Sequence, residues 1–187
     1  MNFNARKAAQ TIAYFCLKNG GRPVNVLKAV KLVYIADRES IRHRGHPIQN
    51  DRHVSMPHGP VNSMTLSFID GIYGDNDFGW SDFLSDRQNH DIGLARSSIS
   101  VTDLDELSRA DLGQLDAVWD QFGSMGQYQL RDWTHDRNNV PEWEDPDGSS
   151  RPIALEKIFE AVGYPESSEH AAEVKSLRSV DEVFSRV

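Results

Sequence analysis

The chain of 187 residues is long enough to bury a core without a disulfide or a metal, and it fits one ordinary domain, or a domain with a tail. Cys16 is the only cysteine, which excludes an internal disulfide and any zinc site built from several cysteines, and indicates a reducing compartment. No window approaches the ~18 apolar residues of a membrane span, and no apolar signal region follows the N-terminus. We therefore expect a cytoplasmic protein without a membrane partner.

The net charge of −8 is distributed unevenly along the chain. Residues 1–60 carry ten Lys/Arg against three Asp/Glu, a net charge of +7, whereas the other residues carry ten Lys/Arg against twenty-five Asp/Glu, a net charge of −15. Either the basic part binds an acidic partner, or the two parts pack against each other, and we favour packing because it needs no third molecule. The overall acidity argues against nucleic acid as a partner, since non-specific DNA binding depends on clustered cations.

Two helices are predicted in the first 45 residues. The first runs from about Ala5 to Lys18, where apolar residues recur at helical spacing and glycines follow. Asn25 is suited to capping a second helix, from Val26 to about His43, which is apolar on two faces. A helix of that kind is usually central to a core.

The next segment combines a short strand with a helix. His53–Met56 alternates like a strand, His58-Gly59-Pro60 then turns the chain, and Pro60 suits the first turn of a helix that extends to about Ile72. Residues 75–90 are polar and predict a long loop or a partly ordered insert, with Trp80 and Phe83 as isolated anchors.

Short strands are predicted around Ile92–Leu94 and Ile99–Val101, where apolar and polar residues alternate. Ser108 through Asp111 then predicts the capped start of a helix to Phe122, and Ser124 through Gln127 a second capped start, leading to a helix that ends near His135.

The C-terminal part continues with a polar loop over residues 141–150 and a short helix from Pro152 to Val162. A last helix over residues 168–187 carries Leu177, Val180 and Phe184 along one stripe. The predicted fold is mainly α with a small β element: a compact helical domain around the buried helix 26–43, with short antiparallel strands or a hairpin and a C-terminal helix.

The seven histidines and the one cysteine are the residues that could form a metal or nucleophilic site. His43 and His46 flank a helix end, and His53 and His58 flank a strand and a turn, so neither spacing makes the ligands of a metal converge. Cys16 lies on the apolar stripe of the first helix, where cysteine behaves as a small hydrophobe. We predict no catalytic residue, no metal site and no cofactor.

Asp37 interrupts an apolar stripe of the predicted central helix. Because an unpaired buried carboxylate is costly, it needs a cationic or hydrogen-bonding partner, and Arg38, Arg52 and His53 are the candidates. We expect a structural clamp rather than a functional group.

Five stretches resemble a known family when taken together. They are Lys31-Leu32-Val33-Tyr34-Ile35-Ala36-Asp37-Arg38, Arg44-Gly45-His46-Pro47-Ile48, Asp51 through Val61, Leu130-Arg131-Asp132-Trp133-Thr134-His135, and Pro141-Glu142-Trp143. In order and spacing they resemble the SocA-like antitoxin, or Panacea-domain, family over residues 5–162. The residues that carry the resemblance are Tyr34, Asp37, Gly45, Pro47, His58, Gly59, Pro60, His135, Pro141 and Trp143.

The resemblance implies a non-enzymatic protein that binds and neutralises a cognate protein toxin, either by occlusion or as an adaptor that hands the toxin to an AAA+ protease such as ClpXP. It implies a Panacea domain over residues 1–165 and a helical tail over residues 166–187. Candidate partner-binding residues lie in the basic N-terminal part, the insert and the tail: Arg38, Arg42, Arg44, Arg52, Trp80, Phe83, Leu177, Val180 and Phe184.

Two other functions remain open at this point. A small hydrolase or metal enzyme would need Asp51, His53, His58 and His135 to converge. A DNA-binding regulator would present arginines 38, 42 and 44 to the nucleic acid. We expect instead that His58 and His135 form fixed hydrogen bonds that build the fold.

Overall fold

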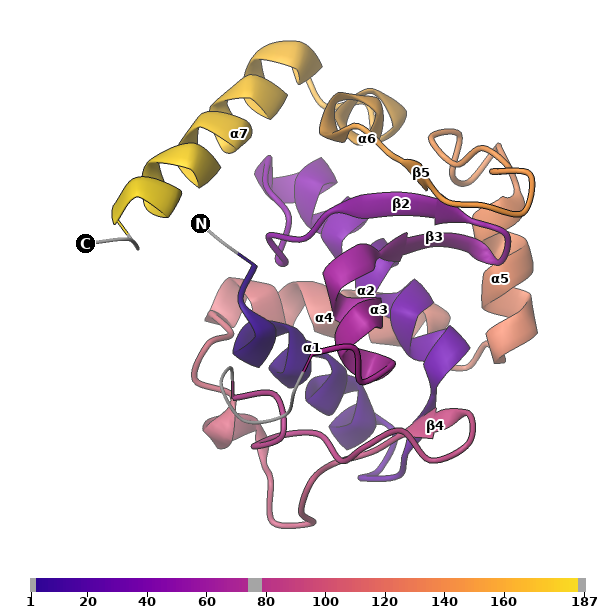
Figure 1. The fold of residues 1–187 in the computed structure, drawn as a ribbon, viewed down its shortest axis with the longest axis vertical. Coiled ribbons are helices and arrows are strands. Elements are labelled where there is room, and N and C mark those ends of the chain that lie inside the picture. Colours follow the sequence, from indigo (N-terminus) through magenta and orange to yellow (C-terminus); the bar gives the residue numbers. More distant parts are fainter. Residues whose placement is uncertain (1–2, 74–78, 185–187) are drawn as a thin grey trace.

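The structure of the protein, a computed structural model, describes residues 3–73 and 79–184, and side chains as far as Ser176. It is mainly helical with two small antiparallel sheets, which confirms the predicted fold class (Figure 1). The described helices are α1 (Ala5–Lys18), α2 (Val26–Arg44), α3 (Ser63–Ile69), α4 (Arg109–Phe122), α5 (Gln127–His135), α6 (Leu155–Ala161) and α7 (Ser167–Phe184), with a 3-10 turn η1 at Val101–Asp103.

Helix α2 is the centre of the core, as predicted. Its residues from Ala29 to Arg38 are all buried, and α1, α4, α5 and a β hairpin pack around it (Figure 1). The Asn25 side chain accepts from the backbone N–H of Leu27 at 3.1 Å and caps the helix. Gly45 ends it in the left-handed region, at φ 73°.

Three strands form the larger sheet: β2 (His53–Met56), β3 (Gly59–Asn62) and β5 (Arg151–Pro152), in the order β3-β2-β5. The hairpin of β2 and β3 packs on α2, with its turn toward α5 (Figure 1). The smaller sheet pairs β1 (Val24–Asn25) with β4 (Asp91–Ile92).

The two helices predicted to begin at prolines begin later. Pro60 lies in β3 opposite Ser55, and α3 starts at Ser63, because the Asp51 carboxylate accepts from the N–H groups of Met64 and Thr65 in its first turn. Pro152 lies in β5, so α6 starts at Leu155. A proline suits an edge strand as well as a helix start, since it lacks an N–H in either place.

Two other local predictions were wrong. Val101 belongs to the 3-10 turn η1 instead of a strand, because the Asp103 side chain accepts from the N–H of Ser100 and closes a capping box. Ser124 does not cap α5; the Gln129 side chain accepts from the N–H of Gly126, and the helix begins at Gln127.

The C-terminal helix α7 exists as predicted, and its beginning packs on α6. Ala171 is fully buried and Val174 half-buried against Ile158 and Phe159. The side chains of Leu177, Val180 and Phe184 lie outside the described residues. No helix in the described ranges combines the length and apolar character of a membrane span.

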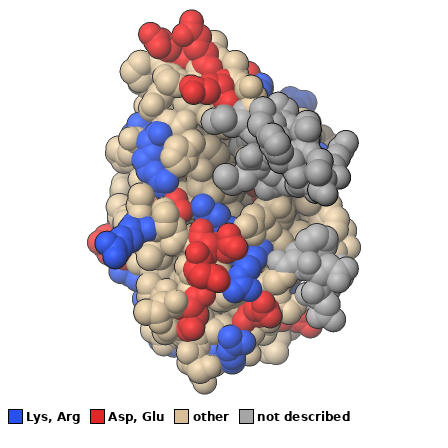
Figure 2. Space-filling model, turned by 90° about the vertical axis from the view of Figure 1, so that its left-hand side faces the viewer, with Lys and Arg blue, Asp and Glu red and all other residues tan. Residues whose placement is uncertain are grey.

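The basic N-terminal part and the acidic remainder pack against each other, which confirms the reading we favoured. Arg6 pairs with Asp82 and Asp105, and Lys7 pairs with Asp111. Further pairs of this kind are Lys18–Asp116, Arg38–Glu142 and Arg44–Asp111. On the face shown in Figure 2, basic and acidic side chains accordingly lie next to one another instead of forming separate patches.

Candidate functional site

The two signature regions meet at the hairpin of β2 and β3. The His135 ring stacks on Trp143 with centroids 4.3 Å apart and planes 8° from parallel. The Trp143 Nε1 donates to the carbonyl of Met56 at 3.2 Å, and the buried His135 Nε2 has no hydrogen-bond partner among the described residues. These contacts join the end of α5 and the loop after it to the hairpin turn, while the His58 side chain is exposed and forms no hydrogen bond with the described residues.

Gly59 is the point where the signature residues approach most closely. Its φ is +93°, and a Cβ there would lie 2.7 Å from Thr134 Oγ1, 3.0 Å from Lys31 Nζ and 3.1 Å from His135 Cδ2. Any larger residue would therefore be strained in its backbone and would collide with α5. The glycine of the His-Gly-Pro stretch is required by packing.

Asp37 is a clamp between α2 and the strands. Its Oδ1 accepts from the N–H of Gln49 at 2.8 Å, and its Oδ2 accepts from Asn62 Nδ2 at 2.8 Å and lies 3.1 Å from His53 Nε2. Of the three candidate partners, the structure selects His53. Arg52 is exposed beside Met64, and Arg38 points to another carboxylate.

That other carboxylate is Glu142, between Pro141 and Trp143. The Arg38 Nε donates to Glu142 Oε1 at 2.7 Å, and the Tyr34 hydroxyl donates to the same oxygen at 2.9 Å. All three side chains are buried. Burial, and next the adjacent Glu142 charge, hold the pKa of Tyr34 well above its usual 10. This cluster links α2 to the second signature region.

Lys31 is a buried cation that sequence reasoning did not single out. Its side chain is fully buried in α2, and Nζ donates to the carbonyl of Pro60 at 2.9 Å. Burial lowers the pKa of Lys31 to about 7, because the charged form loses its hydration. The sequence feature that could have indicated its burial is its position, because Lys31 lies within a helix predicted to be apolar on two faces.

A sequence model of the family described as antitoxin SocA-like, Panacea domain, matches residues 30–144, more than half of the chain. The chain belongs to this family. The match begins within α2 and ends just after Trp143, so it spans the residues that meet at the hairpin of the Panacea domain. Neither a curated protein nor a solved structure matches the chain. Family membership supports a general antitoxin role and, with it, a partner toxin.

The other signature residues lie at the edges of the Panacea domain. Gly45 has a left-handed backbone, and a Cβ at this position would collide with the Tyr164 hydroxyl. Pro47 is half-buried, and His46 Nδ1 lies 3.3 Å from its carbonyl oxygen. Pro141 is exposed beside the buried Glu142. These positions shape turns around the central helix.

The candidate partner-binding residues are distributed over different environments. Trp80 and Phe83 are in the core, with 6% and 2% of their surface exposed, so they anchor the insert. Arg38 is buried against Glu142, and Arg44 donates to the buried Asp111 at 2.7 Å. Arg42 and Arg52 are exposed.

The residues of the two alternative functions are not gathered in the described part of the domain. Asp51 caps α3, His53 contacts Asp37, and His135 stacks on Trp143. No group of three or more potential metal-ligating side chains occurs among the described residues. Burial raises the pKa of the Cys16 thiol to about 12, so the thiolate that a nucleophile needs is scarce at neutral pH. Of the three arginines proposed for DNA, only Arg42 is exposed.

Proposed function

We propose that this Panacea domain is an antitoxin that neutralises a cognate protein toxin by binding it, without catalysis. The observation that carries the proposal is the family match over residues 30–144. The polar signature residues support it, because Tyr34, Asp37 and His135 are engaged with other parts of the same chain. Their role is to hold the domain together, which leaves partner recognition to its outer surface.

Co-expression with the protein encoded by the adjacent gene tests the proposal. We expect the neighbour alone to arrest growth, this chain to restore it, and the two proteins to co-purify as a complex. Circular dichroism of the purified chain establishes that it is folded. Failure of a folded chain both to restore growth and to bind the neighbour would contradict the proposal.

Among the exposed candidates, we propose Arg42 and Arg52 as contacts to the toxin. The Arg42 guanidinium lies 3.4 Å from the Glu39 carboxylate, one helical turn away, and Arg52 Nη2 donates to the sulfur of Met64 at 3.7 Å. Exposed arginines that are not held in strong internal pairs are suited to protein interfaces. Arg42→Glu and Arg52→Glu should weaken toxin binding, whereas Lys157→Glu, at an exposed pair on α6, should not.

We also propose an adaptor role for the tail, residues 166–187, which would deliver the bound toxin to an AAA+ protease such as ClpXP. Removing the whole tail would expose Phe159, because Ala171 packs in the same cluster. A chain that ends at Ser176 keeps this packing and is the sharper variant. We expect it to bind toxin normally and to lose toxin degradation by the protease. Unchanged degradation would assign delivery to another element.

A further inference from the structure

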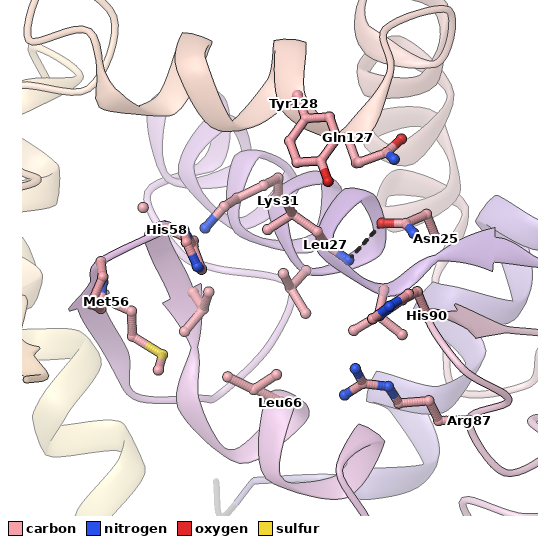
Figure 3. A pocket seen from close by; sticks show the side chains of 15 residues that line it. Asn25, Leu27, Lys31, Met56, His58, Leu66, Arg87, His90, Gln127 and Tyr128 are labelled. Carbon is pink, nitrogen blue, oxygen red and sulfur yellow. Dashed lines mark hydrogen bonds between the residues drawn. The ribbon is translucent and has the colours of Figure 1, made fainter. Parts of the chain in front are cut away.

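A pocket of about 470 Å³ opens beside the hairpin turn (Figure 3). It lies between the first turns of α2, strands β2 and β3, helix α3, the 87–90 loop and the first turn of α5. Four segments that are separate in the sequence therefore build one concavity. Its volume is within the range of pockets that hold small organic ligands.

The body of the pocket is apolar. Leu27 and Val30 of α2, Val61 of β3 and Leu66 of α3 line it, and Met56 borders the hairpin side. Tyr128, with 60% of its surface exposed, stands at the rim. Apolar walls of this kind bind a hydrocarbon group by removing it from water.

Apart from the Tyr128 phenol at its rim, the titratable side chains of the pocket are all basic. They are Lys31, His58, Arg87 and His90, and none of the described residues that line the pocket is Asp or Glu. This bias contrasts with the chain as a whole, which has 28 Asp and Glu against 20 Lys and Arg. Figure 3 shows Arg87 and His90 on one side of the cavity, and the Lys31 amine beside His58 on the other.

The two cations differ in how they are satisfied. Arg87 Nη1 donates to Asp70 at 2.6 Å and Nε donates to the carbonyl of Asn89 at 2.8 Å, so its charge is already balanced and its position fixed. Lys31 Nζ donates to the carbonyl of Pro60, and no carboxylate among the described residues forms an ion pair with it. Because burial lowers the pKa of Lys31 to about 7, an anion bound nearby would favour the protonated amine, and little water screens the attraction between the two.

We propose that this pocket binds a small apolar carboxylate, an aliphatic or aryl-substituted acid, with its carboxylate at the Lys31–His58 end and its hydrocarbon part over Leu27, Val30, Val61 and Leu66. The His58 ring, exposed at the turn, donates to the carboxylate directly. The Lys31 charge lies just behind this contact. Ligand binding at this site is separate from the neutralisation of a toxin, so the two proposals stand or fall independently.

A titration followed by two-dimensional amide NMR tests the site on the full chain. Hexanoate and 3-phenylpropionate are the probes, and hexanamide and 3-phenylpropionamide are their uncharged counterparts of nearly equal shape. We expect the acids to cause saturable shifts of the amides of residues 26–31, 56–61 and 127–128. Hexanamide and 3-phenylpropionamide should bind about tenfold more weakly than the acids, since they lack the negative charge that strengthens the hydrogen bonds.

Two variants on α2 form a matched pair. Lys28 also donates to a backbone carbonyl, that of Gly123 at 2.6 Å, and burial also lowers its pKa, but it does not line the pocket. Lys31→Met should weaken binding of the acids about tenfold, whereas Lys28→Met should leave it unchanged. His58→Ala removes an exposed ring and provides a second test if Lys31→Met does not fold.

The possible outcomes are decisive. The proposal would be overturned if neither acid caused saturable shifts. It would also be overturned if the acids and their uncharged amide counterparts bound equally well. Wild-type affinity in both folded pocket variants, Lys31→Met and His58→Ala, would overturn the placement of the carboxylate. If the acids do not bind but a toxin protects the same amides, the pocket is a protein-docking site and the small-ligand proposal fails.

Discussion

The Arg38 guanidinium and the Glu142 carboxylate form an ion pair across 104 residues of sequence, with 2.7 Å between Nε and Oε1. The exposed fractions of the two side chains are 3% and 0%. The pair connects the central helix to the loop before β5, and the Tyr34 hydroxyl donates to the same oxygen. Burial makes each charge dependent on the other.

Replacing Glu142 should therefore be severe. Glu142→Ala removes the 2.7 Å partner of the buried Arg38 charge, which keeps the longer 3.4 Å contact to Glu39, and leaves the Tyr34 hydroxyl without its acceptor. We expect the free energy of unfolding to fall by roughly 3 kcal/mol, measured by urea denaturation. The control is Glu144→Ala, two residues away, whose partner Lys157 is exposed. Equal effects of the two changes would contradict the importance of burial.

Gly59 and Gly20 allow packing to be separated from backbone strain. Both have positive φ, +93° and +74°, but a Cβ at Gly59 would meet Thr134, Lys31 and His135, whereas nothing lies within 4 Å of one at Gly20. We expect Gly59→Ala to cost about 3 kcal/mol or more and Gly20→Ala about 1 kcal/mol. Thermal and urea unfolding of the two variants provide the comparison. Similar losses would mean that strain alone requires the glycine.

The pair of cations on Asp111 predicts an acid-sensitive stability. Burial raises the pKa of Asp111, but hydrogen bonds from Arg44 and Lys7 outweigh it and lower the pKa from 3.8 to about 2. The carboxylate therefore contributes about 2 kcal/mol of stability above pH 4, which is lost as the pH falls through about 2. Asp111→Asn should flatten this part of the stability curve. If the unfolding free energy of the variant decreased with acidification as steeply as that of the wild type, other carboxylates would be responsible for the acid sensitivity.

Lys31 predicts a second rise of stability with pH, in a higher pH range. Because its pKa falls from 10.5 to about 7 on folding, the unfolded chain binds the extra proton between these values. Stability should therefore rise with pH above 7, by about 1.4 kcal/mol per pH unit from this group. The nearby titratable groups are the imidazoles of His58 and His135. The pKa of His135 is lowered from 6.5, so His135 does not titrate between pH 7 and 10.5. Urea unfolding at pH 7 and pH 9 should show a smaller rise for Lys31→Met; an identical rise would refute the assignment.

Some features of the site follow from sequence because they are local. The Asn25 cap and the Gly45 stop define α2 through contacts within a few residues, and the two apolar faces of this helix require a central position. Asp37 follows the same logic, since a carboxylate on an apolar stripe needs a partner, and His53 was among the few candidates near enough in sequence.

Other features were decided only by tertiary structure. Trp80 and Phe83, predicted as isolated anchors in a polar insert, are core residues, because the chain around them folds back onto α1 and α3. The Pro60 strand depends on Asp51 capping a helix 12 residues later, and no periodicity in the sequence reports such a contact.

The charges show the division most clearly. The sequence by itself determined that a basic N-terminal part and an acidic remainder were present, and simple complementarity favoured their packing together. Only the tertiary structure assigned Glu142 to Arg38 and placed Lys31 beside a backbone carbonyl, with no carboxylate partner among the described residues, because burial and pairing depend on which side chains meet across the core. That assignment separates the residues that hold this Panacea domain together from those that can bind a ligand or a partner.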